Sequence, residues 1–198
     1  MKEQIIVTIG REYGSGGHHI AQEIAEKLGV KLYDKELLEQ MVRDSGYTKD
    51  DVEKYDEKPV NPFLSRKVRN YSNSIEEVMA EKVFDFIRDR AEEGESFVVV
   101  GRCSENVLRG NPNTVSVFVL GDMKDKLARI EKLYNLSESK AMLAIKKKDK
   151  LRKLYHNYYS DIKWGDSRGY HVSVNSSLLG IEGTVDMLMD LIDKFRNA

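Results

Sequence analysis

The chain has 198 residues, of which 40% are hydrophobic and 33% charged, and its formal net charge is −1 at pH 7. This length suits one domain with a sizeable core, and so small a charge excludes a global field that would recruit nucleic acid or an anionic membrane. The single cysteine excludes an internal disulfide framework, and no stretch has the apolar length of a signal peptide or membrane span. These features predict a cytoplasmic protein with one domain over residues 1–198 and no membrane partner.

The N-terminal part of the chain is an apolar, β-branched run, then a glycine-rich turn, then an amphipathic helix. Residues 5–9 predict a strand, and the glycines lie within residues 14–17. Glycines let a ligand approach the backbone, and the N–H groups of such a turn and of the next helix converge on an anion, above all phosphate. The usual phosphate loop ends in Gly-Lys-Ser/Thr, whereas here Gly17 and His18 follow Gly16. The alternative is a turn with no ligand.

Four more strands are predicted, and helical segments lie between them except between the strands at 97–101 and 115–120, where a turn at 111–113 is expected. The strands are expected at residues 31–34, 97–101, 115–120 and 170–175. The helices are expected from about residues 34, 75, 122, 137 and 185. The alternation predicts an α/β fold with a parallel sheet and right-handed crossovers, in which ligands bind beyond the carboxyl ends of the strands.

Two regions interrupt the alternation. Residues 47–74 contain Pro59 and Pro62 among many charges, and residues 137–168 hold the basic run 146–153 followed by tyrosines. Both regions are expected to act as flaps over the glycine-rich turn.

Phosphoryl transfer requires positioning and positive charge around the transferring group. Without a lysine in the loop, that charge must come from elsewhere. Arg11 precedes the glycines, and Arg102 directly follows a buried strand at the ligand-binding edge. Lys148 and Arg152 are four residues apart on the basic run and share a helix face. The alternative for this run is a solvated face or a loose nucleic-acid patch.

Acidic and histidine candidates lie at the same edge of the sheet. Asp34 can cap the following helix, and it can also hold Mg²⁺ through water or accept a hydrogen bond from a substrate hydroxyl. His18 and His19 diverge by about 100° on a helix, so they cannot chelate one metal together. Each either donates to a phosphate or lies on the surface. We expect no metal ion held by protein ligands alone.

Six short motifs are spread along nearly the whole chain. They are Arg-Glu-Tyr-Gly-Ser-Gly-Gly at 11–17, Tyr-Asp-Lys-Glu-Leu-Leu at 33–38, Gly-Arg-Cys at 101–103, Lys-x-Asp-Lys-x-Arg at 147–152, Lys-Trp-Gly-Asp at 163–166 and Asn-Ser-Ser-Leu-Leu-Gly at 175–180. Together they resemble the cytidylate kinase-like family. The resemblance implies a P-loop NTPase fold of the nucleoside monophosphate kinase type: a three-layer sandwich with a five-stranded parallel sheet. It also implies a substrate-binding insertion at about 47–74 and a lid at about 137–168.

The resemblance also implies roles for particular residues. In cytidylate kinases, a Gly-Arg-Asp stretch after the third strand holds the acceptor nucleotide; Arg102 matches its arginine, but Cys103 replaces the aspartate. Arg152 resembles the lid arginines that clamp the phosphates in transfer. Val100 stands where many P-loop enzymes carry a second carboxylate for Mg²⁺.

The resulting hypothesis is a kinase that binds ATP (or GTP) with Mg²⁺ and transfers the γ-phosphate to a nucleoside monophosphate, first CMP or dCMP, or to another small acceptor. The residues assigned to catalysis are Arg102, Lys148, Arg152 and Asp34. Those assigned to nucleotide binding are Arg11, Gly14, Ser15, Gly16, Gly17, His18 and His19. One rival is a weak or inactive nucleotide-binding switch, favoured by the missing lysine, hydroxyl and carboxylate. A less favoured rival is a nucleic-acid binder that uses residues 146–153.

Overall fold

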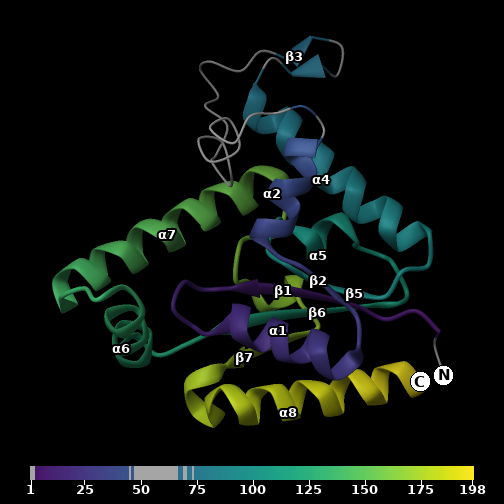
Figure 1. Ribbon diagram of the computed structural model, residues 1–198. Coiled ribbons are helices and arrows are strands. Elements are labelled where there is room, and N and C mark those ends of the chain that lie inside the picture. Colours follow the sequence, from purple (N-terminus) through teal and green to yellow (C-terminus); the bar gives the residue numbers. More distant parts are fainter. Residues whose placement is uncertain (1–2, 45, 47–66, 69–70, 73) are drawn as a thin grey trace.

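The computed structural model describes residues 3–44, 46, 67–68, 71–72 and 74–198, and its centre is a five-stranded sheet between helices (Figure 1). The strands are β1 (Ile6–Arg11), β2 (Lys31–Tyr33), β5 (Phe97–Val100), β6 (Thr114–Leu120) and β7 (Val172–Asn175). Their order is β2-β5-β1-β6-β7, and every pairing is parallel. The predicted α/β fold with a five-stranded parallel sheet is therefore confirmed.

Helices cover both faces of this sheet. The elements on one face are α1 (Gly17–Leu28) and α8 (Ser176–Asn197), and those on the other are α2 (Lys35–Asp44), α4 (Ile75–Glu92) and the short α5 (Ser104–Val107) (Figure 1). Beyond the carboxyl ends of the strands lie α6 (Met123–Tyr134) and α7 (Glu138–Tyr159), which pack against each other. A 3-10 turn, Ser167–Gly169, precedes β7, and a separate antiparallel pair joins β3 (Lys67–Val68) to β4 (Tyr71–Ser72).

The central strands are continuously apolar because helices cover both of their faces. In β5, Val98 and Val100 pack in the core beneath α1 and α8, whereas Phe97 and Val99 pack in the core beneath α2 and α4. This two-sided burial fixes β1 and β5 side by side, so the segments that follow them leave the sheet at the same edge.

The last helix begins earlier than the apolar spacing from residue 185 indicates. It starts at Ser176, directly after β7, because the Asn175 side chain accepts a hydrogen bond from the Ser177 N–H and so caps it. Gly180, with φ 71° and ψ −178°, kinks the helix before the apolar stretch starts. The helix start therefore lies beside the glycine-rich loop, where the Ser176 hydroxyl donates to the Ser15 carbonyl over 2.6 Å.

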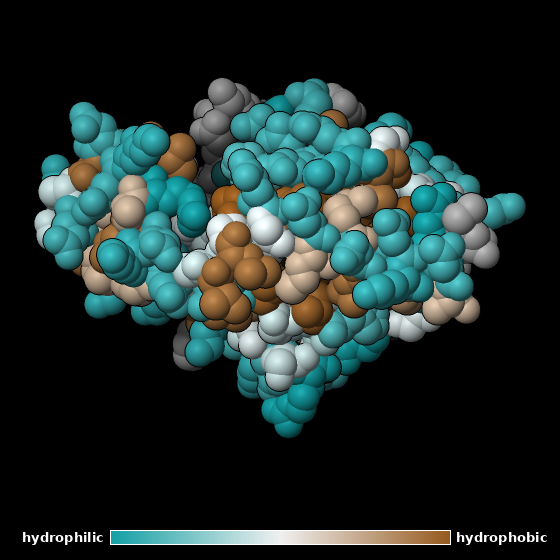
Figure 2. All heavy atoms as spheres, turned by 90° about the horizontal axis from the view of Figure 1, so that it is seen from below, coloured by the Kyte–Doolittle hydropathy of each residue, from teal (hydrophilic) through white to brown (hydrophobic). Residues whose placement is uncertain are grey.

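Within the described part of the chain, every helix is too short or too polar to cross a membrane. The predicted insertion at 47–74 lies mostly outside the described residues, and its role stays a prediction. Figure 2 shows the face on which α8 lies, with apolar surface among hydrophilic side chains. The exposed large apolar side chains of α8 are Leu178, Leu179 and Met187.

Candidate active site

The loop between β1 and α1 has the backbone of an anion cradle. Gly14 and Gly16 have φ values of 84° and 82°, which glycine adopts without strain. Gly16, the N-cap of α1, has no side chain, and the Ser15 Oγ accepts the N–H of Gly17, the first residue of α1, over 3.4 Å. The first N–H groups of a helix lack intrahelical partners and attract negative charge. The buried Ser15 hydroxyl donates to the Glu12 carbonyl over 2.9 Å, so it shapes the loop from inside.

Gly17, where a usual phosphate loop has its lysine, has no space for a side chain. A Cβ atom at Gly17 would lie 2.6 Å from the Cβ of Arg11, closer than real Cβ contacts allow. Arg11 is the last residue of β1, and its stem therefore occupies the space beside the loop. The Arg11 side chain therefore occupies the space that a lysine at position 17 would need.

A buried lysine on α6 ties the loop to α7. Lys126 is 3% exposed, and its Nζ donates to Glu12 over 3.0 Å and to Asp149 over 2.9 Å. The other oxygen of the Asp149 carboxylate accepts the Tyr13 N–H over 2.6 Å. The network fixes α7 against the glycine-rich loop through charge-assisted hydrogen bonds.

A second cation on α6 lies directly at the glycines. An Arg129 N–H donates to the Gly14 carbonyl, and the Arg129 Cζ lies 3.5 Å from where a Cβ of Gly16 would be. Sequence reasoning missed both Lys126 and Arg129. Their spacing of three residues, on one face of the helix after β6, is the signal that was available.

The segment after β5 has three consecutive residues in the left-handed region. The φ values are 74° at Gly101, 57° at Arg102 and 55° at Cys103. Non-glycine residues pay about 1 kcal/mol or more for this conformation, and such strain clusters at functional sites. Arg102 is 6% exposed, so the strained backbone places a guanidinium inside the molecule.

Three predicted arginines meet at one small cavity. Arg11, Arg102 and Arg152 line it, together with Tyr155 and His156 of α7. Its volume is about 20 Å³, close to that of one water, whereas ligand pockets usually measure about 300 Å³ or more. The arginines therefore converge on a space that is too small for a nucleotide in this structure.

Arg152 also contacts the glycine-rich loop directly. Its Nη1 donates to the Arg11 carbonyl over 3.2 Å, and its guanidinium carbon lies 5.5 Å from the centre of the Tyr13 ring. Tyr170 also lines the cavity, and burial raises its pKa, so its phenol is neutral at physiological pH. The arginines thus face a polar but uncharged ring.

The other candidate residues lie outside this cavity. One oxygen of Asp34 accepts the Leu37 N–H over 3.1 Å and caps α2; the other lies 3.1 Å from His18 Nε2. His19 pairs with Glu23 along the exposed side of α1, at 3.1 Å. Lys148 is exposed and does not line the cavity in the described structure. The structure therefore groups Asp34 with His18 and leaves His19 and Lys148 on the surface.

The chain was then compared with known proteins. Residues 6–178 match the family described as "Cytidylate kinase-like family". The chain belongs to this family. The curated cytidylate kinase of Archaeoglobus fulgidus is 25% identical over 193 residues, which cover 94% of each chain. The match confirms the resemblance seen in the motifs.

Solved structures support the same fold for this member of the cytidylate kinase-like family. The crystal structure of an uncharacterized protein from Eubacterium ventriosum is 39% identical, with a TM-score of 0.77 and coverage of 96% of this chain and 99% of that one. Shikimate kinase from Bacteroides thetaiotaomicron is 14% identical, with a TM-score of 0.57 and coverage of 96% and 98%. The second likeness shows the fold alone, which is that of the P-loop kinases.

Proposed function

We propose that this protein is a nucleoside monophosphate kinase that transfers the γ-phosphate of ATP to CMP or dCMP in the presence of Mg²⁺. The observation that supports it best is the convergence of Arg11, Arg102 and Arg152 on one cavity beside the glycine-rich loop. They come from β1, the segment after β5, and α7. Fixed positive groups placed around a transferring phosphoryl group are the main requirement of this chemistry.

The glycine-rich loop and α6 form the proposed donor site. The N-terminus of α1 binds the β- and γ-phosphates through backbone N–H groups, and Arg129 at Gly14 supplies charge that a loop lysine would otherwise give. A Cβ at Gly16 would lie 2.2 Å from the Cδ1 of Ile181, so α8 borders the same place. The exposed Leu178 and Leu179, near Ile181 in sequence, offer apolar surface for the base.

Mg²⁺ in this proposal is held by the nucleotide with help from one carboxylate. Asp34 is hydrogen-bonded to His18 at the start of α1, and one or two carboxylates with phosphate oxygens and waters are a common Mg²⁺ set. These residues fit an ion bound through water, which neutralises charge on the phosphates. The Ser15 hydroxyl points into the loop toward Glu12, so it does not take the role of the usual P-loop hydroxyl.

Arg102 is the proposed partner of the acceptor phosphate, and Arg152 neutralises charge during transfer. Arg102 lies buried at the carboxyl end of β5, where a guanidinium can bind a phosphate with two parallel hydrogen bonds. Because Tyr155 and His156 of α7 line this small cavity, α7 withdraws for acceptor binding and then closes in this proposal. Residues 137–168 are accordingly the proposed lid.

The second candidate function is a nucleotide-binding switch without turnover. It is favoured by the packing at Gly17, which leaves no space for a loop lysine. In that case nucleotide binding at the loop shifts α7 through Asp149 and Lys126 without any transfer.

The test combines binding with turnover. The thermal midpoint is measured with ATP and GTP, with and without Mg²⁺, because a ligand selective for the native state raises it. Product formation is then followed by chromatography with CMP, dCMP, UMP and small hydroxylated metabolites as acceptors. CDP or dCDP formation is the expected result. Nucleotide binding without any product would favour the nucleotide-binding switch over the kinase. Salt-sensitive RNA binding without nucleotide binding would contradict both and favour a nucleic-acid binder.

A further inference from the structure

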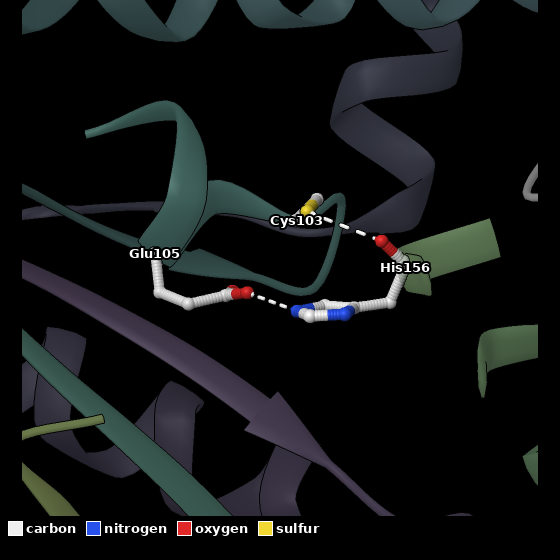
Figure 3. Close-up of side chains that lie close together, drawn as sticks. All are labelled: Cys103, Glu105 and His156. Atoms are coloured by element: carbon white, nitrogen blue, oxygen red, sulfur yellow. Dashed lines mark hydrogen bonds and ion pairs between the residues drawn. The ribbon is translucent and has the colours of Figure 1, made fainter. Parts of the chain in front are cut away.

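Three side chains of types that bind metals meet between α5 and α7. Cys103 precedes α5, Glu105 belongs to it, and His156 lies near the end of α7. Their candidate ligand atoms all lie within 4.8 Å of one another, and all three residues are buried. Figure 3 shows the Glu105 carboxylate directed at the His156 ring and the Cys103 sulfur directed at the His156 carbonyl oxygen. Neither the glycine-rich loop nor the predicted arginine roles use this cluster.

The contacts within the cluster are close and polar. Glu105 Oε1 lies 2.5 Å from His156 Nε2, and the two side chains are only 4% and 7% exposed. The Cys103 Sγ lies 4.0 Å from the carbonyl oxygen of His156. In the described part of the chain, the buried His156 Nδ1 has no hydrogen-bond partner. Burying such groups costs free energy that apolar side chains of the same size would avoid.

The backbone that positions Cys103 in this cluster is also strained. Its φ of 55° follows the 57° of Arg102, and neither residue is a glycine. Strained backbone and buried groups with incomplete hydrogen bonding lower the stability of the fold, and packing alone does not explain their presence. A bound ion would offset them, since it replaces a hydrogen bond between two side chains with direct bonds to three.

We propose that Cys103, Glu105 and His156 bind one Zn²⁺ ion, or a similar divalent transition metal, which fastens α7 to the segment after β5. Sulfur, nitrogen and carboxylate oxygen together form a donor set that suits Zn²⁺, whereas Mg²⁺ prefers oxygen alone. Metal–ligand bonds of about 2.0–2.3 Å place neighbouring tetrahedral ligand atoms roughly 3.3–3.7 Å apart. The observed spacings reach that arrangement with shifts of about 1 Å.

Three protein ligands leave a fourth coordination position for water. All three residues line the cavity shared by Arg11, Arg102 and Arg152, so that position lies near the predicted acceptor site. Burial raises the pKa of the Cys103 thiol; the ion therefore displaces the thiol proton when it binds. Because His156 belongs to α7 and the other two ligands do not, the ion holds α7 in its closed position.

The test is a Co²⁺ titration of the full-length, reduced protein after chelator treatment. Co²⁺ takes the place of Zn²⁺, and its bond to a thiolate gives a charge-transfer band in the near ultraviolet. The chain has one cysteine, so such a band can arise only from Cys103. We expect a band that saturates at one Co²⁺ per chain, disappears on addition of Zn²⁺, and needs no nucleotide.

Two variants and one control assign the ligands. Cys103→Ser, which nearly preserves the side-chain volume, should abolish the band, and His156→Gln should weaken Co²⁺ binding at least tenfold. His19→Gln, an exposed histidine paired with Glu23, should leave the titration unchanged. Circular dichroism establishes that each variant is folded. Absence of the band in the parent, or a band of equal affinity in His156→Gln, overturns the site, whatever the outcome of the kinase assays.

Discussion

The glycine-rich loop and the segment after β5 leave neighbouring strands at the same edge of the sheet, yet their side chains are opposite in kind. Ile9 of β1 is level with Val100 of β5, and both segments enter the left-handed region within a few residues. The loop does so at Gly14 and Gly16, which carry no side chains. The segment after β5 does so at Arg102 and Cys103 and presents side chains instead. In the proposed function, one backbone conformation thus serves the donor phosphates in one place and the acceptor phosphate in the other.

The helix α7 contacts both regions and so relates them. Near its middle, Asp149 binds the Tyr13 N–H and Arg152 the Arg11 carbonyl, both beside the loop. Two turns later, Tyr155 and His156 pack beside Cys103. A movement of α7 therefore changes both regions together, which is the behaviour expected of a lid.

The largest expected effect is on kcat, and it distinguishes two basic residues of α7. Arg152→Ala should lower kcat for phosphoryl transfer by about 10³-fold or more, as the loss of an arginine finger does, with little change in the KM for ATP. Lys148→Ala is the matched control, since Lys148 is exposed and should leave kcat unchanged. Steady-state kinetics with CMP measure both. Equal kcat values for the two variants would make the basic run a solvated face.

The next largest effect is on the free energy of unfolding, and it concerns the ion pairs of Lys126 that connect the loop to α7. Lys126→Met should destabilise the protein by about 3 kcal/mol, because it leaves the Glu12 and Asp149 carboxylates without their shared cation. Urea unfolding gives the free energy, and Lys124→Met, an exposed position on the same helix, is the control. If both variants unfold at the same urea concentration, the Lys126 network does not hold α7.

The smallest effect compares two glycines with the same backbone. Gly16→Ala and Gly94→Ala introduce a side chain at φ values of 82° and 81°, so each should lose about 1 kcal/mol of stability. At Gly94 nothing lies within 4 Å of the new Cβ, whereas at Gly16 it meets Ile181. Only Gly16→Ala should therefore also lose the thermal shift caused by ATP. A retained shift would place the phosphates elsewhere.

The sequence predicted the sheet well because its signals are local. The β-branched runs of β1, β5 and β6 and the glycines after them describe buried parallel strands without reference to the rest of the chain. The short α5 has too few residues for a periodic pattern, and it was not expected. The spacing of Lys126 and Arg129 places them on one face of α6, but their contacts with the glycine-rich loop depend on α6 folding back over it, which that spacing does not encode.

Which side chains of α7 contact the glycine-rich loop could not be predicted from local sequence either. Lys148 and Arg152 are four residues apart and were expected to share a role. The rotation of the helix is set by Asp149, whose carboxylate binds Tyr13 and Lys126. On a helix, Arg152 lies about 60° from Asp149 and Lys148 about 100° from it on the same side, so the two basic residues are about 40° apart. The spacing placed Lys148 and Arg152 on one face of the helix. The tertiary contacts of Asp149 decide that Arg152 is the one that contacts the loop.

The central claim is that the loop holds the donor and the segment after β5 holds the acceptor. Calorimetric titration of ATP with Mg²⁺ and of CMP, each into the parent, Arg102→Ala and Arg102→Lys, tests it most directly. The account predicts that Arg102→Ala loses CMP affinity at least tenfold and keeps its ATP affinity, and that Arg102→Lys recovers part of the loss, since lysine cannot make the bidentate contact. Equal loss of both ligands in Arg102→Ala would contradict it.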